Sequence, residues 1–276
     1  MFHDETFQCY NVLQKTIYFC SIKIMHSIHV KHTGSIFTPH EFICQFAPHL
    51  LSVQLPPYCI FSLIPHPERY IKKQPASSSK FLFESKFLHF KQPVPHVMIY
   101  GGMGAPIAGF SLEIAIELGI QNILIIGTCG LLDPKIKSGD TVVPSRFIRE
   151  EGTSLHYVPP DEIIPTITHL NTIICQRLES YGVPCFQGLH WTTDAPFRET
   201  SDKIIRYRHE GCLSLDMESS ALFAIAQYYH KKIAAILIGS DHLSDKEWNP
   251  PQPSYQRITT RIKEIVPLLP EIFQAF

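Results

Sequence analysis

Short apolar runs that end in glycine-rich turns alternate with helical patterns in the middle of the chain. Residues 96–100 (HVMIY) form one apolar run, which ends in the turn Gly101-Gly102-Met103-Gly104. Apolar residues then recur at helical spacing as far as Gly119, at Ile107, Phe110, Ile114 and Leu118. A second apolar run, 122–126 (NILII), ends in Gly127-Thr128-Cys129-Gly130. This order of strand, helix and strand predicts a βαβ unit with parallel strands.

Similar patterns follow on both sides of this unit. Further strands are predicted at 58–64, 141–143 and 233–238, and helices at 166–180, at 217–230 and, interrupted by Pro267 and Pro270, at 255–275. Residues 71–80 (IKKQPASSSK) have the composition of an exposed loop. Residues 1–55 show no sustained period and are predicted to be an N-terminal segment, followed by one α/β domain over 56–276 with a largely parallel sheet.

The composition is that of a globular protein with a sizeable core. Of 276 residues, 45% are hydrophobic and 18% are charged, and the formal net charge is −1. A chain without a basic excess is not expected to bind nucleic acid or an anionic membrane surface. An anionic ligand must therefore be held by a few well-placed donors. No run of 18 apolar residues predicts a membrane span.

Cysteine and histidine usage indicates neither a metal site nor a disulfide framework. The 8 cysteines are scattered, without a CxxC pair, and the 15 histidines include no HExxH motif. We therefore expect reduced, mostly buried thiols, no metal, and a cytoplasmic location. No signal peptide is evident, and Met25 is an alternative start, which the intact mass of the native protein would test.

Asp241 follows the apolar run 233–238 directly, at the point where the chain leaves the predicted core. A partly desolvated carboxyl group favours its protonated form, and such an acid can protonate a leaving base. The simpler interpretation is a helix N-cap or a loop carboxylate. Position alone does not decide between the two.

Other polar segments lie where ligands bind in open α/β sheets, at the carboxyl ends of strands. Glu218 follows Asp216-Met217 at a predicted helix start, where an acidic residue suits the helix dipole, or where its carboxylate could accept hydrogen bonds from a sugar diol. The glycines of 101–104 and 127–130 form either plain tight turns or an anion pocket with the Thr128 hydroxyl. A dinucleotide fingerprint is disfavoured because Ile107 occupies the third glycine position, and no Walker A motif occurs.

Seven segments together resemble the purine nucleoside and uridine phosphorylase family. They are GMGAP (102–106), GTCG (127–130), SGDTVVP (138–144), REEGTS (149–154), WTTDAPFRET (191–200), DMESSAL (216–222) and GSD (239–241). The resemblance implies a single-domain three-layer sandwich, with a central mixed, partly barrel-like sheet flanked by helices. It also implies a homo-oligomer, a trimer or hexamer. The implied reaction is attack of inorganic phosphate on a nucleoside, giving free base and pentose 1-phosphate without a cofactor.

The resemblance also implies a role for individual residues. Thr128 is expected to contact phosphate, with Gly127 and Gly102 shaping the pocket. Met217 is expected against the ribose and Glu218 on its hydroxyls. Base contacts are expected from Phe197, Arg198 and Glu199. Asp241 matches the acid of purine-cleaving members, which favours a purine substrate.

Two departures bear on phosphate binding. Ile125 stands where the family typically has an arginine, and the family's glycine-rich arginine loop corresponds to Pro65-His66-Pro67-Glu68-Arg69, which leaves Arg69 as a candidate ligand. Arg149 is another basic group that could serve. The alternatives are a uridine phosphorylase, a nucleosidase of the same superfamily that uses water, and a nucleoside-binding protein without catalysis.

Overall fold

The computed structural model describes residues 34–71, 75–82, 85–251 and 255–276. The chain divides into two units, Met1–Ser35 and Ile36–Phe276, and the fold below is that of the second unit. Met25 and most of the predicted N-terminal segment lie outside the described residues. The second unit begins with helix α2 (Pro39–Phe46), whose N-cap Thr38 forms a capping box with Glu41.

Ten strands of the described residues form one mixed sheet, in the order β10-β9-β6-β7-β8-β5-β1-β4-β3-β2. The parallel strands β1 (Tyr58–Ser62), β4 (His96–Tyr100), β5 (Asn122–Leu131) and β9 (Lys232–Leu243) make its centre. The hairpin of β2 (Ser77–Lys80) and β3 (Lys86–Phe90) extends one edge. The remaining strands are β6 (Thr141–Glu150), β7 (Cys185–Thr193), β8 (Cys212–Asp216) and β10 (Trp248–Asn249).

One half of the sheet closes on itself. Strand β5 pairs with β9 as well as with β8, so that β9, β6, β7, β8 and β5 form a ring. A register shift between Cys129 and Leu131 of β5 accompanies the bend of this long strand. The predicted mixed, partly barrel-like sheet is therefore confirmed.

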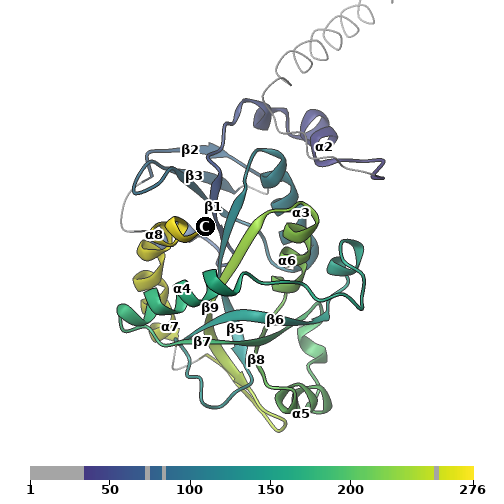
Figure 1. Cartoon of the computed structure of the whole chain (residues 1–276), viewed down its shortest axis with the longest axis vertical. Coiled ribbons are helices and arrows are strands. Elements are labelled where there is room, and N and C mark those ends of the chain that lie inside the picture. The colour runs from purple at the N-terminus through teal and green to yellow at the C-terminus, as the bar shows by residue number, and fades with distance from the viewer. Residues whose placement is uncertain (1–33, 72–74, 83–84, 252–254) are drawn as a thin grey trace, which may run out of the picture. The chain divides into compact units, whose positions relative to one another are not determined.

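Helices lie on both faces of the sheet, as Figure 1 shows. Helices α3 (Ala105–Glu117) and α6 (Ser219–Tyr228) pack together on one side. Helices α4 (Thr168–Ser180), α7 (Tyr255–Ile265) and α8 (Leu269–Ile272) cover the other. Helix α5 (Ser201–His209) packs against β8. The three layers of the predicted sandwich are thus present.

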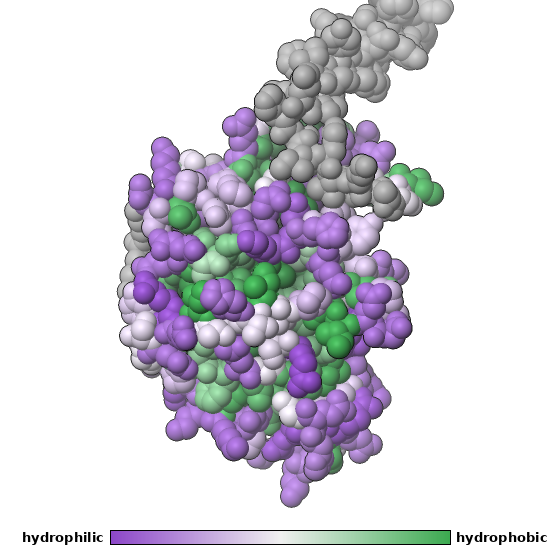
Figure 2. All heavy atoms as spheres, viewed as in Figure 1, coloured by the Kyte–Doolittle hydropathy of each residue, from purple (hydrophilic) through white to green (hydrophobic). Residues whose placement is uncertain are grey.

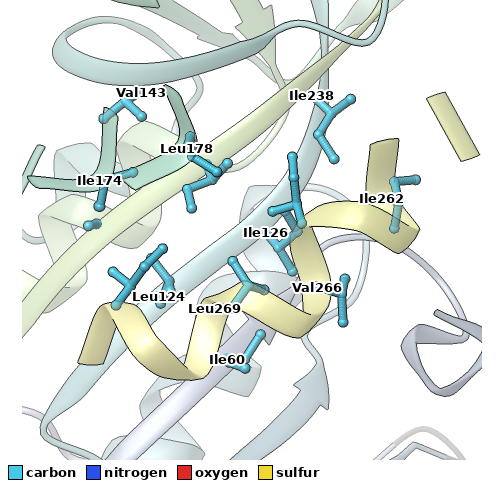
Figure 3. Packing of buried hydrophobic residues seen from close by; sticks show 14 of the residues in the cluster. Ile60, Leu124, Ile126, Val143, Ile174, Leu178, Ile238, Ile262, Val266 and Leu269 are labelled. Carbon is cyan, nitrogen blue, oxygen red and sulfur yellow. The ribbon is translucent and has the colours of Figure 1, made fainter. Parts of the chain in front are cut away.

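Alternation along β5 divides its side chains between the two helical layers. Leu124 and Ile126 join the core cluster that contains Ile174 of α4 and Leu269 of α8 (Figure 3). Ile125 lies between them in sequence, so it points to the opposite face, where it is fully buried. Burial on both faces explains why β5 and β9 read as continuous apolar runs.

Polar and apolar residues are unevenly distributed over the surface (Figure 2). On the face drawn in Figure 2, hydrophilic residues dominate the periphery and apolar residues gather toward the centre. No helix in the described ranges is long and apolar enough to cross a membrane.

The predicted elements are present; the strand foreseen at 58–64 ends earlier, at Ser62, and three other strands are longer than expected. The strands foreseen at 122–126 and 141–143 extend to Leu131 and Glu150, and the helix foreseen from 217 begins at Ser219. The predicted loop at 71–80 is wrong at its end, because Ser77–Lys80 pairs with β3. Strands β7 and β8 and helix α5 were not predicted from the sequence pattern.

The expectation of reduced thiols is wrong for one pair of cysteines. Cys175 of α4 and Cys185 at the start of β7 form a disulfide, with 10 residues of sequence separation. Their sequence spacing carried no sign of this, since the contact depends on how α4 packs against β7. Cys59, Cys129 and Cys212 are buried thiols, as predicted.

Candidate functional site

A cavity of about 590 Å³ opens where the carboxyl ends of the parallel strands meet. Antiparallel pairing of Gly130 with Leu215 brings the end of β8 to the same place. Six of the predicted site residues line the cavity: Thr128, Phe197, Glu199, Met217, Glu218 and Asp241. Gly102, Gly127, Arg69 and Arg198 are not among its lining residues. The fold therefore brings these six residues, from segments that are distant in sequence, to one cavity.

Asp241 lies near the end of β9 and is partly buried. Its Oδ2 accepts a hydrogen bond of 2.7 Å from Nε1 of Trp248, across the β9–β10 hairpin. Its Oδ1 accepts one of 2.5 Å from the Ser240 hydroxyl. Asp241 is thus neither a helix cap nor a free loop carboxylate, because two neighbouring donors fix its orientation inside the cavity.

Glu218 is the most enclosed carboxyl group that faces the cavity directly, with 7% exposure. Its Oε1 accepts a hydrogen bond of 2.5 Å from the backbone N–H of Gly104, and its Oε2 accepts one of 3.3 Å from that of Met217. Gly102 and Gly104 both have positive φ, which lets the 101–104 turn present this N–H. Burial, and then the charge of Asp216, raise the pKa of Glu218 to about 8.

Asp216 stabilises the start of α6, next to Glu218, through hydrogen bonds. Its carboxylate accepts hydrogen bonds from the backbone N–H groups of Glu218 and Ser219, and from the hydroxyls of Thr192 and Ser219. Nε2 of the buried His190 lies 3.0 Å from Oδ1, although it is not aligned for a hydrogen bond. Burial raises the pKa of Asp216, but the charge of His190 and the Ser219 donors outweigh it and hold that pKa below its usual value. Asp216 is therefore an ionised structural anchor, which keeps Glu218 in place.

The Gly127–Gly130 segment of β5 presents Thr128 to the cavity, where its side chain is exposed. Gly127 is packed against Leu63 and Leu237, so closely that a Cβ would lie 3.2 and 3.1 Å from their side chains. Its role is close packing beneath the site. The hydroxyl and backbone of Thr128 remain as donors for an anion.

Basic side chains are lacking where phosphate is expected. Arg69 is exposed at the end of the short helix Pro67–Arg69, and Arg149 is engaged by the loop that follows β6, with the carbonyls of Val158 and Pro159 and the Ser154 hydroxyl as acceptors. Ile125 is inside the core. Among the cavity-lining residues that the structure describes, none is lysine, arginine or histidine, whereas four are carboxylates.

The segment after β7 contributes Pro196, Phe197 and Glu199 to the cavity lining. The Phe197 ring is 98% exposed, which leaves its face open for contact, while Arg198 is exposed and is not among the lining residues. Glu199 caps the short helix Pro196–Arg198 and is partly buried. Burial and the nearby charge of Asp241 raise the pKa of Glu199 to about 7, against the opposing effect of Lys203.

Several residues that line the cavity were not predicted from the sequence, among them Tyr100, Met103 and Trp248. Met103 lies inside the glycine turn and could have been found there. Trp248 carried no signal, because its place beside Asp241 depends on a two-residue strand.

The fold and the cavity together define an α/β protein with an acidic small-molecule site at the carboxyl edge of its parallel strands. No group of three or more His, Cys, Asp or Glu in the described part of the chain is arranged to hold a metal ion.

Comparison with known proteins agrees with this description. The sequence profile of the phosphorylase superfamily matches residues 70–268, which is most of the chain. The chain therefore belongs to the phosphorylase superfamily.

Relatives include two DeoD-type purine nucleoside phosphorylases. The one from Brevibacillus brevis is 30% identical over 144 residues, covering 51% of this chain and 61% of the relative. The one from Mycoplasma genitalium is 28% identical over 153 residues, covering 53% and 63%. The matched part of the chain thus spans about three fifths of the length of these relatives.

Solved structures share the fold. A uridine phosphorylase from Vibrio fischeri has a TM-score of 0.70 at 19% identity, covering 81% of this chain and 94% of that one. A purine nucleoside phosphorylase from Toxoplasma gondii, in complex with immucillin-H, has a TM-score of 0.64 at 21% identity, covering 77% and 89%. At these identities the likeness concerns the fold alone.

Proposed function

We propose that this protein cleaves the N-glycosidic bond of a nucleoside with inorganic phosphate, giving free base and pentose 1-phosphate. The observation that carries the proposal is the convergence of Asp241, Glu218 and Thr128 on one cavity. Cleavage of a nucleoside requires contacts that hold its sugar, a binding site for the nucleophile and a group that neutralises the leaving base. These three side chains offer the corresponding groups.

The substrate favoured by this site is a purine nucleoside. Glu218, once it is ionised, can accept hydrogen bonds from the 2′- and 3′-hydroxyls, and Met217, which lines the cavity next to it, offers an apolar contact for the sugar. The open face of Phe197 suits stacking against a purine ring, and the Asp241 and Glu199 carboxyl groups, which line the same cavity, are polar groups that a base could contact. Thr128 offers a hydroxyl donor to phosphate. No metal or organic cofactor is required for this reaction.

The test is release of free base from inosine, adenosine and uridine, each with and without phosphate. Release from the purine nucleosides only when phosphate is present supports the proposal. Uridine cleavage in preference to the purines would overturn the substrate class. No release from any nucleoside would leave a binding protein without catalysis.

Hydrolysis is the second candidate, favoured by one observation. Among the described residues that line the cavity there is no cation, and the typical arginine position holds buried Ile125. A bidentate arginine is the natural holder of phosphate, whereas water needs none. Base release at an equal rate without phosphate would identify a nucleosidase.

The proposed assembly rests on the resemblance, whereas the proposed location and partners rest on the cysteine usage and the net charge of the chain. We propose a cytoplasmic protein that assembles as a trimer or hexamer and acts on small molecules, without nucleic acid or membrane partners. Disulfides such as Cys175–Cys185 are uncommon in a reducing compartment. Cell fractionation tests the location, and the molar mass in solution tests the assembly.

A further inference from the structure

We propose that Trp248 is a positioning residue for Asp241: its indole N–H holds one carboxyl oxygen and leaves the other to carry the proton for the leaving base. This inference deepens the proposed function, in which Asp241 neutralises the leaving base, and it rests on that function. Trp248 lies outside all seven segments that carry the family resemblance. Its role is therefore argued from the structure of this chain alone.

A tight hairpin places Trp248 beside Asp241. Strand β10 pairs antiparallel with the end of β9, which puts Trp248 opposite Leu243. The turn between the two strands is closed by Ser244, whose backbone N–H donates to the carbonyl oxygen of Glu247 at 2.9 Å. Because the turn and the strand pairing fix the backbone on both sides of the indole, its N–H is held toward the strand that carries Asp241.

The indole N–H is a donor only, so the oxygen that it contacts has to act as an acceptor. Nε1 of Trp248 lies 2.7 Å from Oδ2 of Asp241. A neutral carboxyl group carries its proton on one of its two oxygens, and a proton on Oδ2 would compete with the indole N–H for the same oxygen. The contact with Trp248 therefore assigns the proton of the neutral acid to Oδ1.

The surroundings of Oδ1 suit both the neutral and the ionised acid. The Ser240 hydroxyl oxygen lies 2.5 Å from Oδ1 and 3.0 Å from the carbonyl oxygen of Cys129. A hydroxyl group has one hydrogen to donate and can also accept. With that hydrogen on the Cys129 carbonyl, the Ser240 oxygen can accept from the protonated Oδ1; with the hydrogen turned to Oδ1, it stabilises the carboxylate. Asp241 can thus lose and regain a proton at Oδ1 while Trp248 keeps Oδ2 in place.

The proton transfer balances at Oδ1. A phosphate oxygen forms the bond to C1′ while the bond from C1′ to the base nitrogen breaks, and that electron pair goes to the base. Oδ1 of Asp241 gives its proton to a ring nitrogen, so the base leaves neutral. The carboxylate that remains keeps the Trp248 N–H on Oδ2 and receives the Ser240 hydrogen on Oδ1. Asp241 regains a proton from solvent before the next turnover.

The experiment separates the N–H of Trp248 from its ring. Trp248→Phe keeps an aromatic ring and removes the donor. Trp248→Gln removes the ring and restores a donor, because its amide nitrogen is the same number of bonds from Cα as the indole nitrogen. The Trp248 side chain is 61% exposed, so neither variant leaves a hole in the core. Asn249→Ala is the matched control, since Asn249 lies on the same short strand and outside the cavity lining.

The measured quantity is the ratio of kcat/KM on inosine to kcat/KM on N7-methylinosine, at saturating phosphate and neutral pH. Inosine needs a proton on its leaving base, whereas N7-methylinosine already carries a positive charge on its imidazole ring. The same folded molecules cleave both substrates, so this ratio does not depend on the folded fraction of a variant. Trp248→Phe should lower the ratio about 20-fold, the size of one hydrogen bond to a group that becomes charged. Trp248→Gln and Asn249→Ala should stay within about threefold of the wild-type ratio.

The same ratio in the Asp241→Asn background tests whether Trp248 acts through Asp241. Without the acid, adding Trp248→Phe should lower the ratio no further. A further fall in the double variant, an unchanged ratio in Trp248→Phe alone, or an equal fall in Trp248→Gln overturns the role of the indole N–H. A wild-type protein that cleaves neither substrate overturns the proposed function itself.

Discussion

Replacing Glu218 by alanine should weaken cleavage of ribonucleosides much more than cleavage of 2′-deoxyribonucleosides. Each Glu218 oxygen already accepts one backbone N–H, from Gly104 and from Met217, and keeps acceptor capacity for one sugar hydroxyl. A ribose offers two hydroxyls to this carboxylate. A 2′-deoxyribose offers one.

The size of the effect follows from the burial and the pKa of this carboxyl group. A hydrogen bond to a charged group contributes about 2 kcal/mol, so two contribute about 4 kcal/mol. With its pKa raised to about 8, Glu218 must first lose a proton at pH 7, which costs about 1.4 kcal/mol. The net effect is about 2.6 kcal/mol, or about 80-fold, for a ribonucleoside, and about threefold for a 2′-deoxyribonucleoside.

The assay is kcat/KM for inosine and 2′-deoxyinosine at saturating phosphate. Glu218→Ala also leaves the Gly104 N–H without its acceptor, so Glu218→Gln is the companion variant, since its amide oxygen can keep that contact. Glu218→Gln should lie between wild type and Glu218→Ala on inosine. Thermal unfolding of both variants separates lost stability from lost binding.

An equal loss on the two substrates would refute the reasoning. It would mean that Glu218 supports the 101–104 turn without touching the sugar hydroxyls.

Three further predictions concern other parts of the molecule. Thr128→Val, which keeps the β-branched shape and removes the hydroxyl, should raise the KM for phosphate about tenfold; an unchanged KM would contradict phosphate contact at Thr128. Asp241→Asn should lower turnover of inosine about 100-fold, the size of losing a general acid, because it removes the carboxyl group that can protonate the leaving base; unchanged turnover would take Asp241 out of the mechanism. Cys185→Ser should lower the free energy of unfolding by about 3 kcal/mol, measured by denaturant titration, while kcat stays the same; equal stability with and without reductant would contradict a stabilising disulfide.

The sequence pattern predicted those parts of the fold whose residues are buried on both faces. The runs at 96–100 and 122–126 are short, continuously apolar and followed by a glycine turn, which is the pattern of a strand buried on both faces. Strand β7 and helix α5 were not predicted, and in α5 only Ile204 and Tyr207 are buried among charged residues, so its apolar stripe is short. The hairpin end at Ser77–Lys80 is polar and exposed, so only pairing with β3 makes it a strand.

The site was predictable where a polar residue directly follows a buried strand. Asp241 and Thr128 share this position, and a common sheet edge brings them together. The positions of Trp248 and of the basic side chains could not be predicted from this rule. The indole reaches Asp241 through a short hairpin, and the conformation after β6 turns Arg149 into a loop anchor. Contacts of this kind depend on tertiary packing, which has no period in the sequence.

The most direct test of the account is a crystal structure with phosphate and a C-nucleoside, whose carbon–carbon glycosidic bond cannot be cleaved. We expect the sugar hydroxyls to donate hydrogen bonds to Glu218 and the phosphate to contact Thr128. The base should lie against Phe197, with Glu199 and Asp241 at its edge. A nucleoside bound elsewhere, or bound in this cavity with its hydroxyls away from Glu218, would contradict it.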